Sequence, residues 1–184
     1  MKDAERRLWE QALVIRCQAG DNSAYSELVG AFQGGLARYV GHIVGRQDVD
    51  DLLQQVWLDV YLKLHTLRNL RAFRAWIYRI ARDKAYASCR RKRPVTVEYV
   101  DQESPNEERG EPVFSREEIA GVHRCLQQLS LKHREVMMLR FFENMAYEEI
   151  AETLCCSVGT VRSRIYYARR ALRREMEEEN YAGE

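Results

Sequence analysis

The sequence lacks any apolar run long enough to cross a membrane, which takes roughly 20 consecutive residues. Its N-terminus also lacks the apolar core of a signal peptide. Both absences lead us to expect a cytoplasmic protein without membrane insertion. At 184 residues the chain is long enough for one domain or two small ones.

Cysteine pairs of the CxxC type are also missing, although the chain has five cysteines. A disulfide framework is therefore not expected. A metal site is conceivable from the thiols and imidazoles of Cys125, Cys155, Cys156, His123 and His133. Buried or half-buried thiols without a metal are the favoured interpretation, because structural zinc sites normally have tighter ligand spacing. We expect neither a metal nor another cofactor.

Features of an enzyme acting on nucleic acid are absent as well. The sequence has no convincing carboxylate cluster, no His/Cys catalytic pair and no glycine-rich loop to bind phosphate. Asp48, Asp50 and Asp51 lie together, but the helix dipole favours acidic groups at the start of a helix. We therefore expect a binding protein with no enzymatic activity and no small-molecule substrate.

Proline is scarce, and all three prolines fall in or beside one acidic stretch. Residues 95–118 contain eight acidic residues and two arginines, whereas the rest of the sequence has a nearly continuous helix-forming pattern. We predict an all-α protein of two small helical domains, residues 1–94 and 115–184, joined by a flexible acidic linker at 95–114.

Residues 49–64 carry apolar side chains at intervals of three and four, which predicts a helix with one apolar face. The positions are Val49, Leu52, Leu53, Val56, Trp57, Val60, Tyr61 and Leu64. This pattern alone indicates only that the helix packs on a core. Trp57 and Tyr61 can both belong to that core.

Acidic residues are nearly absent between His65 and Arg93, where ten Lys or Arg residues accompany the single acid Asp83. A helix is predicted from about Arg71, with Phe73, Trp76, Ile77, Ile80, Ala81 and Ala85 on its buried face. Basic and aromatic side chains fall largely elsewhere, namely Arg74, Tyr78, Arg79, Arg82 and Tyr86, followed by Arg90–Arg93. Cations neutralise phosphates and aromatic rings stack on unpaired bases at about 1–3 kcal/mol each. We expect this helix to bind a nucleic-acid strand.

The C-terminal part is predicted to be a four-helix module that contains a helix-turn-helix. Its helices are expected at 115–128, 131–142, 147–154 and from 158 onward. Ser115 and Glu118 have capping-box spacing at the start of the first, and Ser157 caps the last. A short helix, a tight break at Cys155–Cys156 and a longer basic helix form the arrangement that places a helix in the major groove of DNA.

The last of these helices has six arginines and no acid between Ser157 and Arg174. At about 100° per residue, its buried stripe is Val161, Ile165, Ala168 and Leu172. The residues on or beside the opposite face are Gly159, Thr160, Arg162, Ser163, Tyr166, Tyr167, Arg170, Arg173 and Arg174. Arginine reads guanine edges and contacts phosphates, and glycine allows close approach of the backbone. We expect this face to bind duplex DNA.

Together, these segments resemble a bacterial RNA polymerase sigma factor of the extracytoplasmic-function (ECF) class of the sigma-70 family. DVDDLLQQVWLDVYLKL at 48–64 resembles the helix that binds the polymerase clamp. FRAWIYRIARDKAYASCRRKR at 73–93 resembles the helix that melts the promoter and recognises its −10 element. YEEIAETLCCSVGTVRSRIYYARRAL at 147–172 resembles the helix-turn-helix that reads the −35 element. The resemblance covers about residues 18–175.

The resemblance implies roles for individual positions. It assigns polymerase binding to Asp51, Gln54, Gln55, Trp57 and Tyr61. It assigns capture of a flipped −10 base to the loop at 65–72, through His65, Arg68, Asn69 and Arg71. Further −10 contacts fall to Arg74, Tyr78, Arg79, Arg82, Tyr86, Arg90 and Arg91. The −35 contacts fall to Ser157, Gly159, Thr160, Arg162, Ser163, Tyr166, Tyr167 and Arg170.

Three positions depart from the family pattern. Asp83 stands where asparagine is frequent, and Tyr167 stands where a basic residue is common. Cys155 replaces the usual glycine of the helix-turn-helix, which predicts a β-carbon at a left-handed backbone position.

The implied function is that of a dissociable specificity subunit. It binds core RNA polymerase, directs initiation at promoter DNA and is held inactive by an anti-sigma factor. The main alternative is a stand-alone helix-turn-helix regulator that binds duplex DNA without polymerase. That alternative leaves the aromatic and basic helix at 73–93 without a purpose.

Overall fold

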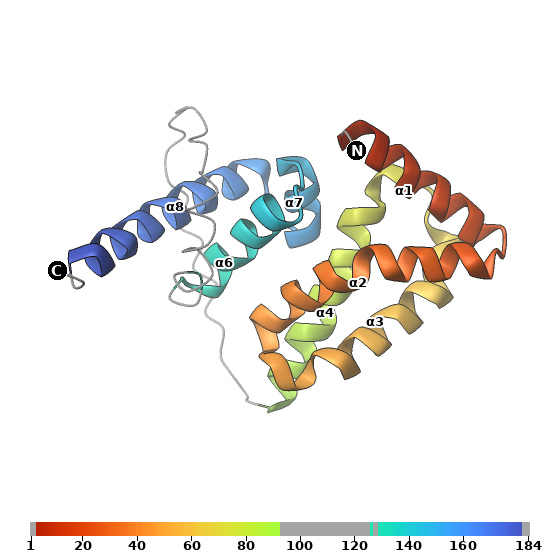
Figure 1. The fold of residues 1–184 in the computed structure, drawn as a ribbon, viewed down its shortest axis with the longest axis horizontal. Helices are drawn as coiled ribbons and strands as arrows, with labels where there is room; N and C mark the ends of the chain where they lie inside the picture. Colours follow the sequence, from red (N-terminus) through yellow and green to blue (C-terminus); the bar gives the residue numbers. More distant parts are fainter. Residues whose placement is uncertain (1–2, 93–125, 127–128, 182–184) are drawn as a thin grey trace. The chain divides into compact units, whose positions relative to one another are not determined.

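The computed structural model describes residues 3–92, 126 and 129–181, which form helices and turns without a strand. The chain divides into two compact units, residues 1–96 and most of residues 97–184 (Figure 1). The predicted linker and nearly all of the predicted helix at 115–128 lie outside the described residues, so the predicted domain boundaries remain a prediction. No helix in the described ranges is long and apolar enough to span a bilayer.

The first unit is built from four helices. These are α1 (Asp3–Gln18), α2 (Asn22–Val44), α3 (Val49–Lys63) and α4 (Phe73–Lys92). Short 3₁₀ turns connect them: η1 (Arg46–Asp48), η2 (Leu64–Thr66) and η3 (Leu70–Ala72). Helix α2 packs against α1, α3 and α4 (Figure 1).

Apolar faces of these helices meet in a common core. Its buried members include Leu28, Leu36 and Val40 from α2, Val56 and Val60 from α3, and Ile77 and Ala81 from α4. Edge-to-face ring pairs add to the packing, with Phe32 against Phe73 at 5.3 Å and Tyr39 against Tyr78 at 5.5 Å between centroids. The helix predicted at 49–64 is confirmed, because most of its predicted apolar face lies in this core, although Tyr61 is exposed.

The second unit contains α6 (Leu131–Met137), the π-helical turn η4 (Met138–Phe142), α7 (Tyr147–Leu154) and α8 (Val158–Tyr181). The helix predicted at 131–142 is therefore α-helical in its first part and widens into a π-helix in its last five residues. The short helix predicted at 147–154 is confirmed. Helix α6 packs against α8.

The turn between α7 and α8 has the geometry that the sequence predicts. Cys155 has φ 52° and ψ 48°, which is the left-handed conformation usually taken by glycine. Ser157 caps α8, because its Oγ accepts a hydrogen bond from the backbone N–H of Thr160 at 3.0 Å. The predicted stripe of α8 is also confirmed, since Val161, Ile165, Ala168 and Leu172 are all buried.

Candidate docking face and nucleic-acid interfaces

One side of α3 faces solvent with a mixture of amide, acidic and apolar side chains. We name this surface the α3 face; it consists of Asp51, Gln54, Gln55, Leu58, Tyr61 and Leu62, all of them exposed. Leu58, Tyr61 and Leu62 are large apolar side chains with 58%, 60% and 56% exposure. Exposed apolar side chains gathered on one helix face are typical of surfaces that contact another protein.

Leu58 and Leu62 were missed by the sequence analysis. They lie one turn apart, on the side of α3 opposite the buried Val56 and Val60. The sequence holds a signal for them, because they are leucines at positions where the helical period predicts polar residues. The long apolar stripe of α3 is the stronger pattern, so the shorter stripe of Leu58 and Leu62 is easily overlooked in the sequence.

Trp57 is buried, with 8% exposure, so its side chain offers little surface for the polymerase contact that the resemblance implies. Its indole Nε1–H donates to Gln33 Oε1 at 2.6 Å, and its backbone carbonyl accepts from the Tyr25 hydroxyl at 2.6 Å. The ring of Tyr25 meets the ring of Tyr61 edge to face at 5.3 Å. Burial raises the pKa of Tyr25 to about 12, so its hydroxyl remains a donor at neutral pH. Trp57 and Tyr25 thus support Tyr61 from beneath the α3 face.

The loop between α3 and α4 exposes four polar side chains. His65, Arg68, Asn69 and Arg71 all face solvent, as the predicted base-capturing loop requires. Asn69 also has a local role, because its Oδ1 accepts the backbone N–H of Arg71 at 3.1 Å and so starts the turn η3. Its amide N–H groups are not needed for that bond.

Two of the residues predicted to face nucleic acid from α4 lie instead in the core. Arg74 is 5% exposed and Tyr78 is fully buried. Arg74 Nε lies 3.4 Å from Glu10 Oε2, and the Tyr78 ring packs on Tyr39. The expectation for both residues is therefore corrected. A helical wheel cannot reveal that α1 supplies a buried carboxylate to the arginine.

The exposed side of α4 therefore differs from the side that the sequence analysis predicts. Arg79, Asp83, Arg90 and Arg91 are exposed. Half-buried Arg82 holds its guanidinium over the ring of half-buried Tyr86 at 4.7 Å. Trp76, expected in the core, is half-buried and lies one turn before Arg79. Trp76 is therefore an aromatic candidate that the sequence analysis missed.

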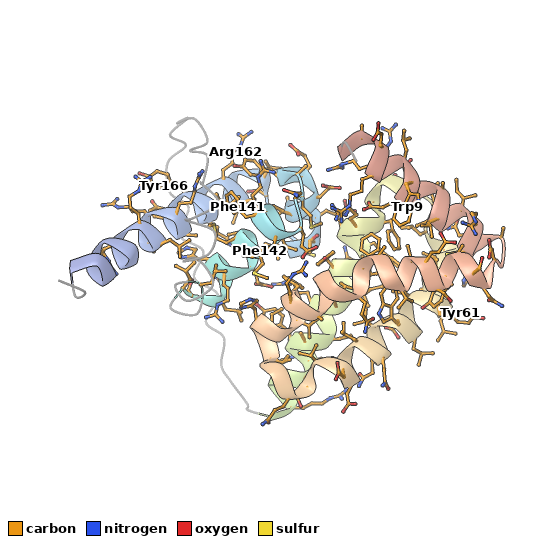
Figure 2. All side chains as sticks on the ribbon, in the orientation of Figure 1. Trp9, Tyr61, Phe141, Phe142, Arg162 and Tyr166 are labelled. Atoms are coloured by element: carbon orange, nitrogen blue, oxygen red, sulfur yellow. The ribbon has the colours of Figure 1, made fainter. Side chains whose placement is uncertain are left out.

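The outward side of α8 matches its predicted composition. Arg162 and Arg170 are exposed, and Tyr166 and Tyr167 are 44% and 39% exposed. The two tyrosine rings meet edge to face at 5.4 Å. Figure 2 shows Arg162 and Tyr166 on the same side of α8, while Phe141 lies on the other side. Phe141 packs under the guanidinium of Arg169 at 5.5 Å.

Hydroxyl groups at the start of α8 already have partners within the helix. The hydroxyls of Ser157 and Thr160 lie 2.9 Å apart, and Ser163 Oγ donates to the Thr160 carbonyl at 3.0 Å. Gly159 is exposed, and a β-carbon there would meet only Ser157 Oγ, at an ordinary 3.6 Å. The fold therefore has room for a side chain at this position.

The conceivable metal site lies partly within the described residues, which include Cys155, Cys156 and His133. Within residues 3–92, 126 and 129–181, no group of three or more His, Cys, Asp or Glu side chains is arranged to hold a metal ion. Cys155 is exposed, and Cys156 is half-buried. Cys125 and His123 lie outside the described residues.

Comparisons with known proteins match both units. The model of Sigma-70 region 2 matches residues 28–95, and that of Sigma-70 region 4 matches residues 115–172. The ECF RNA polymerase sigma-E factor of Escherichia coli K12 is 35% identical over 178 residues, which cover 90% of this chain and 93% of that protein. The sigma-E factor of Haemophilus influenzae is 31% identical over 183 residues, covering 93% and 97%. The chain belongs to the ECF class of RNA polymerase sigma factors.

Solved structures agree with this assignment. CnrH, whose structure was determined in complex with the cytosolic domain of CnrY, superposes on this sigma factor with a TM-score of 0.68. The two sequences are 26% identical, and the match covers 92% of this chain and 97% of CnrH. RpoE of Bartonella quintana, whose structure was determined with the anti-sigma factor NepR, has a TM-score of 0.61. The match covers 83% of this chain and 96% of RpoE, and at 19% identity it supports the fold alone. The α3 face and α4 lie in the segment matched by region 2, and α8 begins in the segment matched by region 4.

Proposed function

We propose that this sigma factor docks on core RNA polymerase through the α3 face and reads promoter DNA through two further surfaces. It acts as a cytoplasmic, non-enzymatic subunit. The observation that carries the proposal is the exposure of Leu58, Tyr61 and Leu62 beside Gln54 and Gln55. Burying one leucine side chain contributes about 1.5–3 kcal/mol. Three exposed apolar side chains with neighbouring amides can therefore supply both affinity and orientation.

The −10 element is proposed to bind along the loop at 65–72 and the exposed side of α4. The loop contributes His65, Arg68, Asn69 and Arg71, and α4 contributes Trp76, Arg79, Arg82, Tyr86, Arg90 and Arg91. Removing a base from the stack costs a few kcal/mol, which stacking and hydrogen bonding in a protein pocket offset. Asp83 lies among these cations and lowers the attraction for phosphate at that point.

The −35 element is proposed to receive the start of α8 in its major groove. The contacting set is Ser157, Gly159, Thr160, Arg162, Ser163, Tyr166, Tyr167 and Arg170. While Ser163 donates its hydroxyl hydrogen to the Thr160 carbonyl, its oxygen can accept a hydrogen bond from a base. It therefore suits the amino groups of adenine or cytosine. The open space at Gly159 supports a close approach of DNA to the backbone.

An anti-sigma factor is the second proposed protein partner. The related structure of CnrH contains the cytosolic domain of CnrY, and that of RpoE contains the anti-sigma factor NepR. By analogy, a partner that covers the α3 face or the DNA-binding surfaces would keep this sigma factor from initiating transcription.

Transcription in vitro tests the docking assignment. Core RNA polymerase plus the sigma factor should start at defined promoters, which sequencing of the transcripts identifies. The double variant Gln54→Ala, Gln55→Ala and the single variant Leu58→Asp should each abolish those starts and co-purification with core enzyme. Lys63→Ala, at the end of the same helix and away from the α3 face, serves as the matched control. Undiminished initiation by the double variant would reject the docking surface.

A further inference from the structure

Gln18, the last residue of α1, forms hydrogen bonds with the loop between α3 and α4. Its Nε2 donates to the backbone carbonyl of Leu64 at 2.9 Å and to that of Leu67, also at 2.9 Å. An amide nitrogen has two N–H groups, so both donors of the side chain are used on this one loop. These bonds span 46 and 49 positions of sequence, and both are partly buried.

The two carbonyls bracket the start of the loop. Leu64 directly follows α3 and begins η2, and its carbonyl also accepts the backbone N–H of Leu67 at 3.1 Å. Carbonyls at a helix end need partners from outside the helix, and a partly buried carbonyl without one costs free energy. Gln18 gives the Leu64 carbonyl a second donor and also donates to the Leu67 carbonyl, while His65 and Arg68 of the same loop are exposed.

Gln18 is itself held in place by the turn that follows it. Gly20 takes φ 88°, a conformation that favours glycine, and lets the chain reverse into α2. Asp21 accepts two hydrogen bonds from the Arg16 guanidinium, at 2.9 and 2.7 Å, and caps α2. The end of α1 is therefore fixed on both sides of Gln18.

The same helix also contacts the second element of the proposed −10 surface. Two turns before Gln18, Glu10 pairs with Arg74 of α4 at 3.4 Å. The two contacts lie about 12 Å apart along α1. Helix α1 thus touches both the loop and α4 through buried or partly buried polar bonds, without belonging to the exposed surface that they form.

We infer that Gln18 is a positioning residue for base selection at −10, acting through the loop at 65–72. The inference rests on the proposed function of that loop. Without the two hydrogen bonds, the loop is no longer fixed to α1 at Leu64 and Leu67, and its exposed side chains lose their fixed position for contact with a base. A displacement of about 1 Å can reduce the rate of a positioned reaction about a hundredfold, and we expect base capture in a positioned pocket to depend on geometry in the same direction.

The experiment uses reconstituted holoenzyme and single-stranded DNA. Non-template-strand oligonucleotides are taken from a promoter that the sigma factor itself initiates, with each base of the −10 element replaced in turn by the other three. The measured quantity is the affinity ratio between the preferred base and its replacements at each position. A 2-aminopurine label reports whether the captured base leaves the stack.

The key variant is Gln18→Glu, which has nearly the same shape but offers only acceptors to two carbonyls. We expect discrimination at one or two adjacent positions to fall roughly ten- to a hundredfold, with loss of the 2-aminopurine signal and unchanged binding to core enzyme. Gln18→Ala, which removes the donors without adding charge, should show the same pattern. Gln11→Glu provides the control, because Gln11 lies two turns earlier on the same face of α1.

Each result has a defined meaning. If the wild-type holoenzyme shows no base preference on single strands, the proposed function of the loop is wrong. If wild type selects a base and both Gln18 variants keep that selectivity, the loop assignment stands and the positioning role is overturned. A uniform loss at every position, together with a lower unfolding temperature, would also overturn it, because that is the effect of a purely structural residue.

Discussion

Asp21 connects α1 to α2 through one carboxylate. Its Oδ1 accepts the backbone N–H groups of Ser23 and Ala24 at 2.9 and 3.1 Å, while Arg16 binds the other oxygen. The hydrogen bonds from Ser23, Ala24 and Arg16 hold the pKa of this carboxyl well below its usual value of 3.8. The native fold therefore favours the ionised form.

This lowered pKa predicts a dependence of stability on acid. Because the native pKa is below the unfolded one, the contribution of Asp21 is present above about pH 4 and is lost as the pH falls through the native pKa. Asp21→Ala should lower the unfolding temperature at pH 7 and flatten the decline below about pH 4. Thermal unfolding followed by circular dichroism at a series of pH values measures both effects.

Asp21→Asn separates the cap from the charge. Asparagine caps helices about as well as aspartate but does not titrate. This variant should keep more of the stability at pH 7 than the alanine variant and lose the same acid-dependent part. An acid profile identical to wild type in the asparagine variant would contradict the assigned origin.

Cys155 shows, also at the scale of one residue, a side chain in a left-handed backbone conformation. The family resemblance predicts a side chain where glycine is usual, and the structure confirms φ 52° there. A β-carbon in this region is strained, and the surrounding helices α7 and α8 must hold it in place.

At the scale of elements, the pair formed by Glu10 and Arg74 joins α1 to α4. Both side chains are about 6% exposed. Burial raises the pKa of Glu10, and the nearby Arg74 opposes that rise. Helix α1 is thus attached by a charged contact in a place where an unpaired charge is unfavourable.

Removing one partner should therefore be more damaging than removing both. Glu10→Ala is expected to destabilise the protein by about 3–5 kcal/mol, because it removes the carboxylate that lies 3.4 Å from the buried Arg74 guanidinium. The double variant Glu10→Ala, Arg74→Leu should recover part of that loss. Urea unfolding gives the free energies, and Glu5→Ala on the exposed side of α1 is the control. Additive losses in the double variant would show that the pair is not coupled.

At the scale of the whole molecule, the two proposed DNA-binding surfaces are of modest size and belong to separate units. Each offers a few cations and aromatic side chains, which is little for tight binding. Linking two weak contacts on one scaffold raises the effective concentration of the second contact. In a sigma factor, the polymerase is the scaffold that sets the distance between them.

This arrangement predicts that the isolated protein binds promoter duplex weakly. In a gel shift, we expect affinity in the range of non-specific binding, about 10⁻⁴–10⁻⁶ M at physiological salt. Adding core enzyme should produce a specific complex that survives competitor DNA. Tight, sequence-specific binding without polymerase would instead favour the stand-alone regulator considered at the outset.

Much of the fold was predictable from the sequence. The buried stripes of α3 and α8 repeat over several turns, so their period identifies the face that packs. Helix α4 was harder, because Arg74 and Tyr78 are polar or amphipathic residues that lie inside. Their burial depends on Glu10 and Tyr39, which are 64 and 39 positions earlier in the chain, and no local pattern contains that information.

The sequence by itself determined the helices now seen as α3, α4, α7 and α8, the helix-turn-helix with its strained cysteine, and the family. These follow from local periodicity, capping and turn chemistry, which act between near neighbours. Only the tertiary structure decided which side of α4 faces outward, that Trp57 supports a surface formed by Leu58, Tyr61 and Leu62, and that Gln18 holds a distant loop. Each of these depends on hydrogen bonds or ion pairs between different helices, which form only after the chain has packed.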